Sequence, residues 1–96
     1  MRNIFIIGCG QLGSSLVKRI SKKRIAKKIF IYERSKKNIS KIKKLKLPGI
    51  IVKSLKIGVM NSDLIIFCTP MSEYKGLISK INKLISSKTL ITDIGS

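Results

Sequence analysis

Three glycines near the N-terminus have the spacing of a phosphate-binding turn. Gly8, Gly10 and Gly13 follow the apolar run Ile-Phe-Ile-Ile and open a segment with helical periodicity. The first glycine allows a tight turn out of a strand, the second lets the backbone approach a pyrophosphate, and the third allows close packing of helix on strand. Free N–H groups of the first helical turn also face such an anion. GxGxxG alone is a weak signal, but a strand before it and a helix after it favour a dinucleotide site over a turn that serves only packing.

A carboxylate follows at the position where this kind of site needs one. Glu33 comes twenty residues after Gly13, at the end of the next predicted strand. It can accept hydrogen bonds from both adenosine-ribose hydroxyls and repels a 2′-phosphate, which favours NAD. Arg34 and Ser35 follow directly and can hold that phosphate instead, so NADP stays open. The alternative for Glu33 is a solvated charge at a strand end.

Further candidate residues follow the fourth and fifth predicted strands. Cys68 ends a strand, and Thr69-Pro70 then turns the chain, because proline lacks an N–H and has a restricted φ. This turn either borders a nicotinamide or is an ordinary strand-to-helix connection with proline opening the helix. Asp93 ends the fifth strand at the same edge. The predicted cofactor-binding set also includes the residues between the glycines, Cys9, Gln11 and Leu12.

Apolar runs alternate with helical patterns along the whole chain. The predicted strands are residues 2–7, 28–32, 50–52, 64–68 and 89–93. The predicted helices are 11–22, 35–46 and 72–84, and residues 54–61 are predicted to form a short helix or a turn. Strands joined by helical crossovers form an α/β, Rossmann-type, doubly wound parallel sheet with strand order 3-2-1-4-5. Ligands of such sheets bind beyond the carboxyl ends of the strands, where all the candidate residues gather.

Helical spacing predicts which apolar side chains face this sheet. The inner face of the first helix is predicted to carry Leu12, Leu16, Val17 and Ile20. The inner face of the second helix is predicted to carry Ile39, Ile42 and Leu45, with Ser35 as its N-terminal cap.

The charge of the chain is strongly basic, with 21 lysines and arginines against four acidic residues and a net charge of +17. Such an excess can indicate nucleic-acid binding. Here the lysines fall at helix-surface and loop positions, and four of the five aromatic residues lie inside predicted strands, so no stacking platform forms. We interpret the charge as a solvated surface that speeds the association of anionic ligands, and we predict no nucleic-acid partner.

Other compositional features exclude several classes of protein. Two cysteines are too few for a disulfide scaffold, and their spacing fits no metal motif. The chain contains no run of about 20 apolar residues, so we predict no membrane partner. The N-terminus lacks the layout of a signal peptide, which predicts a cytoplasmic protein.

Four motifs together resemble the prephenate/arogenate (cyclohexadienyl) dehydrogenases of tyrosine biosynthesis. In chain order they are residues 8–16 (GCGQLGSSL), 32–35 (YERS), 68–74 (CTPMSEY) and 92–96 (TDIGS). The first motif is shared with pyrroline-5-carboxylate reductases and 3-hydroxyisobutyrate-type dehydrogenases, but the last two differ from the usual pattern of those families. Another NAD(P)-dependent reductase, such as a pyrroline-5-carboxylate reductase, and a dinucleotide-binding module without catalysis stay open as alternatives.

The resemblance implies an NAD(P)-binding domain over residues 1–96 and oxidative decarboxylation of prephenate or arogenate, with hydride transfer to NAD or NADP. It also implies that Thr69 and Pro70 border the nicotinamide and that Ser96 lies beside the substrate on the catalytic side. The family continues past this serine to a catalytic histidine, a substrate-binding arginine and a helical second domain that forms a homodimer.

The sequence contains no histidine and ends at Ser96, so the resemblance covers only the cofactor domain. We therefore expect this segment alone to be inactive. We also expect an apolar face around the fifth strand to be exposed and to promote self-association.

Overall fold

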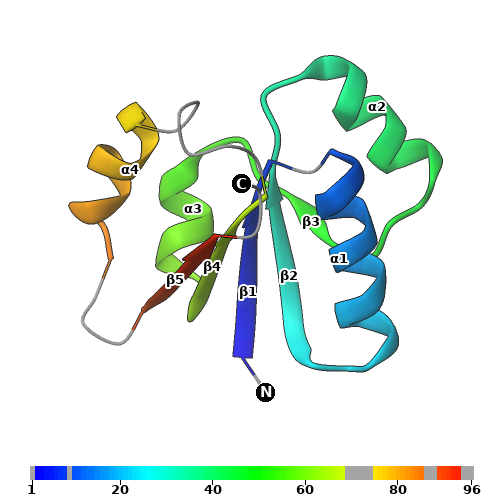
Figure 1. The fold of residues 1–96 in the computed structure, drawn as a ribbon, viewed down its shortest axis with the longest axis horizontal. Helices are drawn as coiled ribbons and strands as arrows, with labels where there is room; N and C mark the ends of the chain where they lie inside the picture. Colours follow the sequence, from blue (N-terminus) through cyan, green and yellow to red (C-terminus); the bar gives the residue numbers. More distant parts are fainter. Residues whose placement is uncertain (1, 9, 69–74, 86–88, 94–96) are drawn as a thin grey trace.

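A computed structural model describes residues 2–8, 10–68, 75–85 and 89–93. Strands and helices alternate throughout this part of the chain (Figure 1). Their bounds are β1 (Arg2–Ile7), α1 (Gln11–Lys22), β2 (Ala26–Tyr32), α2 (Lys36–Lys44), β3 (Ile50–Ile51), α3 (Leu55–Met60), β4 (Leu64–Phe67), α4 (Lys75–Asn82) and β5 (Leu90–Asp93).

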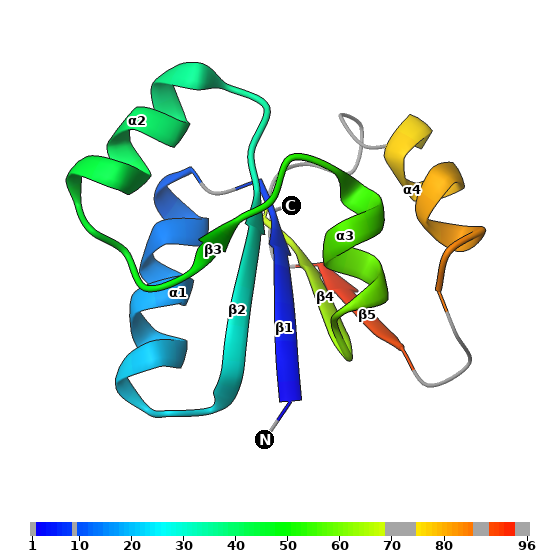
Figure 2. The same cartoon turned by 180° about the vertical axis from the view of Figure 1, so that it is seen from behind.

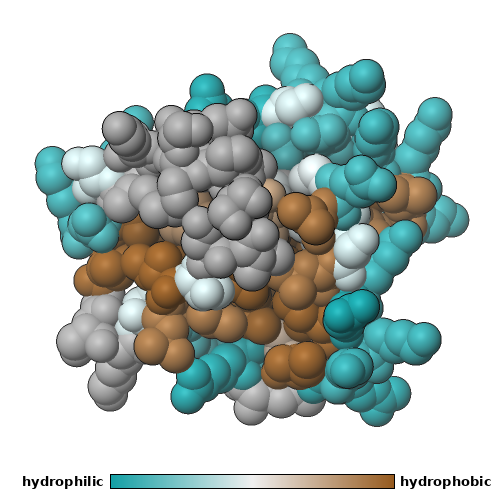
Figure 3. Space-filling model, viewed as in Figure 1, coloured by the Kyte–Doolittle hydropathy of each residue, from teal (hydrophilic) through white to brown (hydrophobic). Residues whose placement is uncertain are grey.

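The five strands form one parallel sheet in the order β3-β2-β1-β4-β5. The predicted α/β fold and the predicted strand order are therefore confirmed. The carboxyl ends of β1, β2 and β4 lie together at the edge where α1 begins, as seen from both sides in Figures 1 and 2. Figure 3 shows hydrophilic residues over α1 and α2 and hydrophobic residues across the middle of the sheet.

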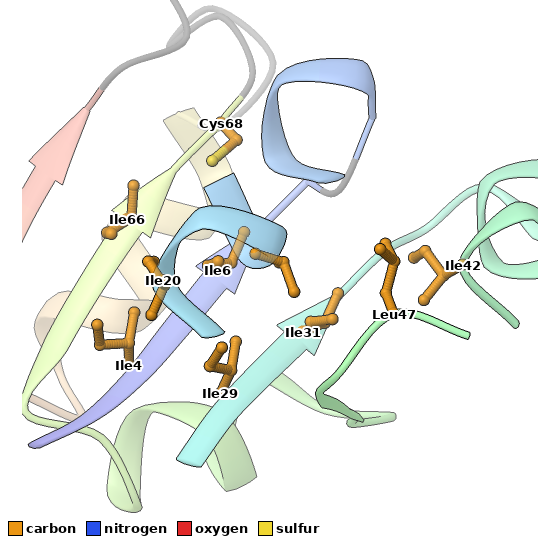
Figure 4. Packing of buried hydrophobic residues seen from close by; sticks show 10 residues of the cluster. Ile4, Ile6, Ile20, Ile29, Ile31, Ile42, Leu47, Ile66 and Cys68 are labelled. Atoms are coloured by element: carbon orange, nitrogen blue, oxygen red, sulfur yellow. The ribbon is translucent and has the colours of Figure 1, made fainter. Parts of the chain in front are cut away.

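Alternating strand residues build two separate cores, one on each face of the sheet. On the first face, isoleucines of β1, β2 and β4 pack against Val17 and Ile20 of α1 and Ile42 of α2 (Figure 4). On the second face, Phe5, Phe30 and Phe67 belong to a cluster that includes Val59 of α3 and Ile81 of α4. Burial on both faces explains why the central strands read as continuous apolar runs rather than alternating ones.

Two leucines predicted to face the core do not. Leu12 is 56% exposed and Leu45 is 55% exposed. In α1 the residues directed at the sheet are Gly13, Val17 and Ile20, because the close approach at Gly13 sets the rotation of the helix and turns Leu12 outward. Leu45 lies just beyond the last turn of α2, where Leu47 takes the buried position instead.

Element boundaries differ from the prediction by a few residues. β2 begins at Ala26 rather than Lys28, because the paired strand β1 extends to Arg2. α2 ends at Lys44 and β3 spans only Ile50–Ile51. α4 is described from Lys75 onward, and the predicted start of this helix at residue 72 lies outside the described residues.

Polar side chains fix the helix starts and the edge of the sheet opposite the glycine turn. The Ser35 hydroxyl accepts a hydrogen bond from the Asn38 amide at 3.3 Å, which confirms the predicted cap of α2. Asp63 accepts a hydrogen bond from the Asn3 amide at 3.0 Å and thereby links the starts of β1 and β4. This carboxylate has a structural role.

Candidate functional site

The glycine turn leaves β1 in a conformation that requires its first glycine. Gly8 has a φ of 84°, in the left-handed region that residues with a Cβ rarely adopt. Its N–H donates to the Tyr32 carbonyl at 2.8 Å, which holds the turn against the end of β2. The predicted tight turn out of the strand is therefore present.

Gly13 lies where α1 approaches the turn most closely. A Cβ at this position would be 2.7 Å from the Gly8 carbonyl oxygen and 3.5 Å from the Cys68 Cβ. The contact with Gly8 involves backbone, so a side chain at Gly13 would push α1 away from β1. This geometry agrees with the predicted role of Gly13 in helix–strand packing.

Gly10 is the N-cap of α1 and faces open space. A Cβ built on it meets no atom of the described residues within 4 Å, and its backbone is extended, with no side-chain hydrogen bond that caps the helix in this part of the chain. The first turn of α1 contains no acidic residue. The start of this twelve-residue helix therefore leaves room for an anion, which the peptide dipoles attract. The residues present thus fit a dinucleotide pyrophosphate.

Glu33 lies just beyond β2, half-buried, at the same edge of the sheet. Its Oε1 accepts a hydrogen bond from the Ser35 amide at 3.1 Å, so this carboxylate helps to shape the turn into α2. The neighbouring Arg34 is exposed. The two residues therefore present one negative and one positive charge beside the glycine turn.

The end of β4 completes this edge. Cys68 is buried, and its amide donates to the Ile7 carbonyl at 2.9 Å. Asp93 pairs in register with Phe67 at the end of β5. The predicted site residues Cys9, Thr69, Pro70 and Ser96 lie outside the described residues.

A groove between α1 and α2 adjoins the glycine turn, and it was not predicted from the sequence. It has a volume of about 450 Å³. Its lining includes Gly10 at the start of α1, Ser15 and Lys18 of α1, and Asn38 and Lys41 of α2. Lysines at helix-surface positions, Lys18 and Lys41 among them, were interpreted from the sequence as a solvated surface.

Positive charge is concentrated in the segment of the chain that contributes Lys18, Asn38 and Lys41 to this groove. Residues 18–46 contain fourteen of the 21 basic residues but only one of the four acidic residues, Glu33. The rest of the chain holds seven basic and three acidic residues. An asymmetry of this size creates a positive potential over one half of the molecule.

The described residues contain neither a cluster of side chains suited to a metal ion nor a helix suited to a membrane. In residues 2–8, 10–68, 75–85 and 89–93, no group of three or more histidine, cysteine or acidic side chains could hold a metal ion. Within the same ranges, no helix has both the length and the apolar character to cross a membrane.

Residues 3–95 match the model of the family described as NADP oxidoreductase, coenzyme F420-dependent. The chain belongs to this family. It is an NAD(P)-binding Rossmann domain of the kind found in dehydrogenases and reductases, and the cofactor class predicted from the glycine turn agrees with the family.

Solved structures with the same fold come from several enzyme classes. Prephenate dehydrogenase from Aquifex aeolicus, in complex with hydroxyphenyl propionate and NAD+, is 24% identical with a TM-score of 0.84 over 100% of this chain. Synechocystis arogenate dehydrogenase is 21% identical with a TM-score of 0.79 over 98%. An imine reductase from Myxococcus stipitatus with NAD+ is 18% identical with a TM-score of 0.83 over 100%.

The chain spans about a third of the length of these structures, namely 34%, 33% and 32%. At these identities the similarity shows the fold. The resemblance to prephenate and arogenate dehydrogenases is one of several that the fold allows.

Proposed function

We propose that residues 1–96 form the cofactor domain of a prephenate/arogenate-type dehydrogenase that oxidatively decarboxylates its substrate with NAD or NADP. The observation that carries the proposal is the arrangement of Gly8, Gly10 and Gly13. They combine a left-handed turn, an open helix start and close helix–strand packing at the carboxyl edge of a parallel sheet.

In this proposal each residue at the edge has a binding role. The amides at the start of α1 hold the pyrophosphate, and the glycine at position 10 leaves space for it. Glu33 faces the adenosine ribose from the β2–α2 turn, and Arg34 and Ser35 beside it can hold a 2′-phosphate. Cys68 and Asp93 belong to the strand ends that line the crevice, together with Cys9, Gln11 and Leu12 of the turn.

The nicotinamide supplies the hydride acceptor when it is bound. Thr69 and Pro70 are proposed to border that ring, and Ser96 to lie beside the substrate. The chain has no histidine to act as a general base, so we propose that residues 1–96 alone bind cofactor without catalysis and that the complete enzyme is a homodimer.

The four sequence motifs support prephenate or arogenate over the substrates of other family members. A different NAD(P)-dependent reductase is the second candidate, since an imine reductase has the same fold at a TM-score of 0.83. An oxidation assay of a longer chain that contains residues 1–96 separates the two. We expect NAD(P)H to form with prephenate or arogenate, whereas NAD(P)H consumption only with an imine substrate would contradict the proposal.

Cofactor binding is tested on the chain itself by titration with NADH, followed by fluorescence. Replacing Gly10 by Val inserts a branched side chain into the space that is open in front of α1. We expect affinity to fall by about tenfold or more, because displaced backbone contacts to a phosphate are charge-assisted hydrogen bonds. Unchanged NADH affinity in Gly10→Val would show that the site assignment is wrong.

A further inference from the structure

The groove between α1 and α2 begins at the glycine turn. Gly10, the N-cap of α1, belongs both to the turn and to the lining of the groove. The groove therefore meets the space in front of α1, where the proposed pyrophosphate lies, at Gly10. A substituent of a ligand held at the turn would enter the groove beside this residue.

The groove offers hydrogen-bond donors and positive charge from two different helices. Lys18 comes from α1 and Lys41 from α2, and both ammonium-bearing side chains are exposed. The hydroxyl of Ser15 and the amide of Asn38 lie on the same lining. Lysine only donates, and hydroxyl and amide groups can donate, so this set suits the oxygens of a phosphate.

One oxygen of the Glu33 carboxylate, the group that favours NAD, accepts a hydrogen bond within the turn into α2. Glu33 accepts the Ser35 amide at 3.1 Å, so part of its negative charge stabilises the turn into α2. It is also the sole acidic residue among residues 18–46, which carry fourteen basic ones. Basic residues thus far outnumber acidic ones in this segment, and their charge opposes the repulsion of a 2′-phosphate by Glu33.

We propose that the groove between α1 and α2 binds the 2′-phosphate of an adenine dinucleotide, and that Lys18 and Lys41 determine a preference for NADP(H) over NAD(H). This inference rests on the proposed function, because it needs a dinucleotide at the glycine turn. It assigns selectivity to two lysines on helix faces, outside the β2–α2 turn in which Arg34 and Ser35 lie.

The experiment compares dissociation constants for NADP+ and NAD+ in the wild-type chain and in Lys18→Gln, Lys41→Gln and the double variant. Lys22→Gln and Lys43→Gln are matched controls, since each removes one exposed charge from the same helix at a position outside this groove. We expect the double variant to weaken NADP+ binding by about tenfold or more, with a change below about twofold for NAD+. The controls should change both affinities equally and slightly.

A second arm separates the groove from the rest of the cofactor site. Adenosine 2′,5′-bisphosphate, adenosine 5′-monophosphate and inorganic phosphate are titrated against the same variants. We expect the bisphosphate to bind more tightly than the monophosphate, and Lys18→Gln and Lys41→Gln to remove that difference. Inorganic phosphate binding as tightly as the bisphosphate would identify a free-phosphate site and overturn the assignment.

The outcomes also distinguish this inference from the proposed function. If the wild-type chain binds NAD+ at least as tightly as NADP+, the selectivity claim is wrong and the cofactor domain stands. Equal losses in the groove variants and the controls would show a general effect of charge and would also refute the claim. If neither dinucleotide nor the bisphosphate binds, both proposals fail.

Discussion

The two ends of the sheet present different surfaces. The half built from residues 18–46 carries fourteen basic residues, and the α1–α2 groove borders the glycine turn there. At the other end, β5 is an edge strand whose Leu90 and Ile91 are 54% and 43% exposed. Both halves use the same parallel strands and buried isoleucines, so the difference lies in which side chains remain outside the core.

The two edge strands of the sheet, β3 and β5, differ in the same respect. β3 has only two residues and is flanked by Pro48 and Lys53, which are features that discourage pairing with another chain. β5 has four residues, and its first three are uncharged. We expected an exposed apolar face at the fifth strand, and the exposure of Leu90 and Ile91 agrees with that expectation. One end of the sheet is thus suited to an anionic ligand and the other to apolar contact.

The largest expected effect is on the free energy of unfolding. It should differ between a buried and an exposed apolar residue at the β5 end of the sheet. Ile81 of α4 is 1% exposed, so Ile81→Ala should lower the free energy of unfolding by about 2–4 kcal/mol. Leu90→Ala is the control, with a cost below about 0.5 kcal/mol because its side chain is already half in water. Urea denaturation measures both values. Equal costs would mean that α4 does not pack on the sheet as described.

Glycine-to-alanine substitutions should change the stability of the chain in opposite directions in the two halves of the molecule. Gly13→Ala places a Cβ 2.7 Å from the Gly8 oxygen, and we expect a loss of about 1–3 kcal/mol in stability. Gly76 lies in α4, and no atom of the residues that the structure describes is within 4 Å of a Cβ built on it, so Gly76→Ala should gain about 0.5–1 kcal/mol from helix propensity. Thermal unfolding tests the pair, and a gain in both variants would contradict the close packing at the turn.

Self-association should depend on the β5 end alone. Leu90→Lys puts a charge on the exposed edge strand, and we expect it to shift the chain from associated species toward monomer. Leu45→Lys makes the same change at a residue of similar exposure in the basic half and should leave association unaltered. Sedimentation at high protein concentration measures both variants. A wild-type chain that is monomeric at every concentration would contradict the prediction.

The smallest expected effect is the dependence of NADH affinity on salt. A dinucleotide presents few phosphates, so its affinity should fall only by a few-fold between about 50 and 200 mM salt. A nucleic acid bound by the basic half would lose about 10³–10⁵ in affinity over the same range. Titrations of NADH and of a short RNA at the two salt concentrations compare the two cases. Tight RNA binding with the steep dependence would overturn the interpretation of the charge as solvated surface.

Much of this structure was predictable because its signals are local. The apolar runs at residues 2–7 and 64–68 and the cap at Ser35 define element types within a few residues. The right-handed crossover rule then leaves few ways to order the strands. The glycine turn was predictable for the same reason, since Gly8 and Gly13 meet requirements set by backbone geometry.

The predictions that failed depended on contacts between distant parts of the chain. Leu12 and Leu45 satisfy the helical period, yet the approach of α1 at Gly13 and the position of Leu47 leave both exposed. The α1–α2 groove joins Lys18 to Lys41, which are 23 residues apart in sequence and belong to different helices. The apolar periodicity of a single helix does not reveal how two helices pack against each other.

The sequence by itself determined the order of strands and helices, the phosphate-type turn at residues 8–13 and the excess of positive charge. These follow from residue type and spacing, because backbone preferences and apolar periodicity act over a few residues. Only the tertiary structure decided where the lysines converge and which apolar residues stay outside the core. Those outcomes depend on how closely each helix packs on the sheet, and that distance is set by side chains from several elements at once.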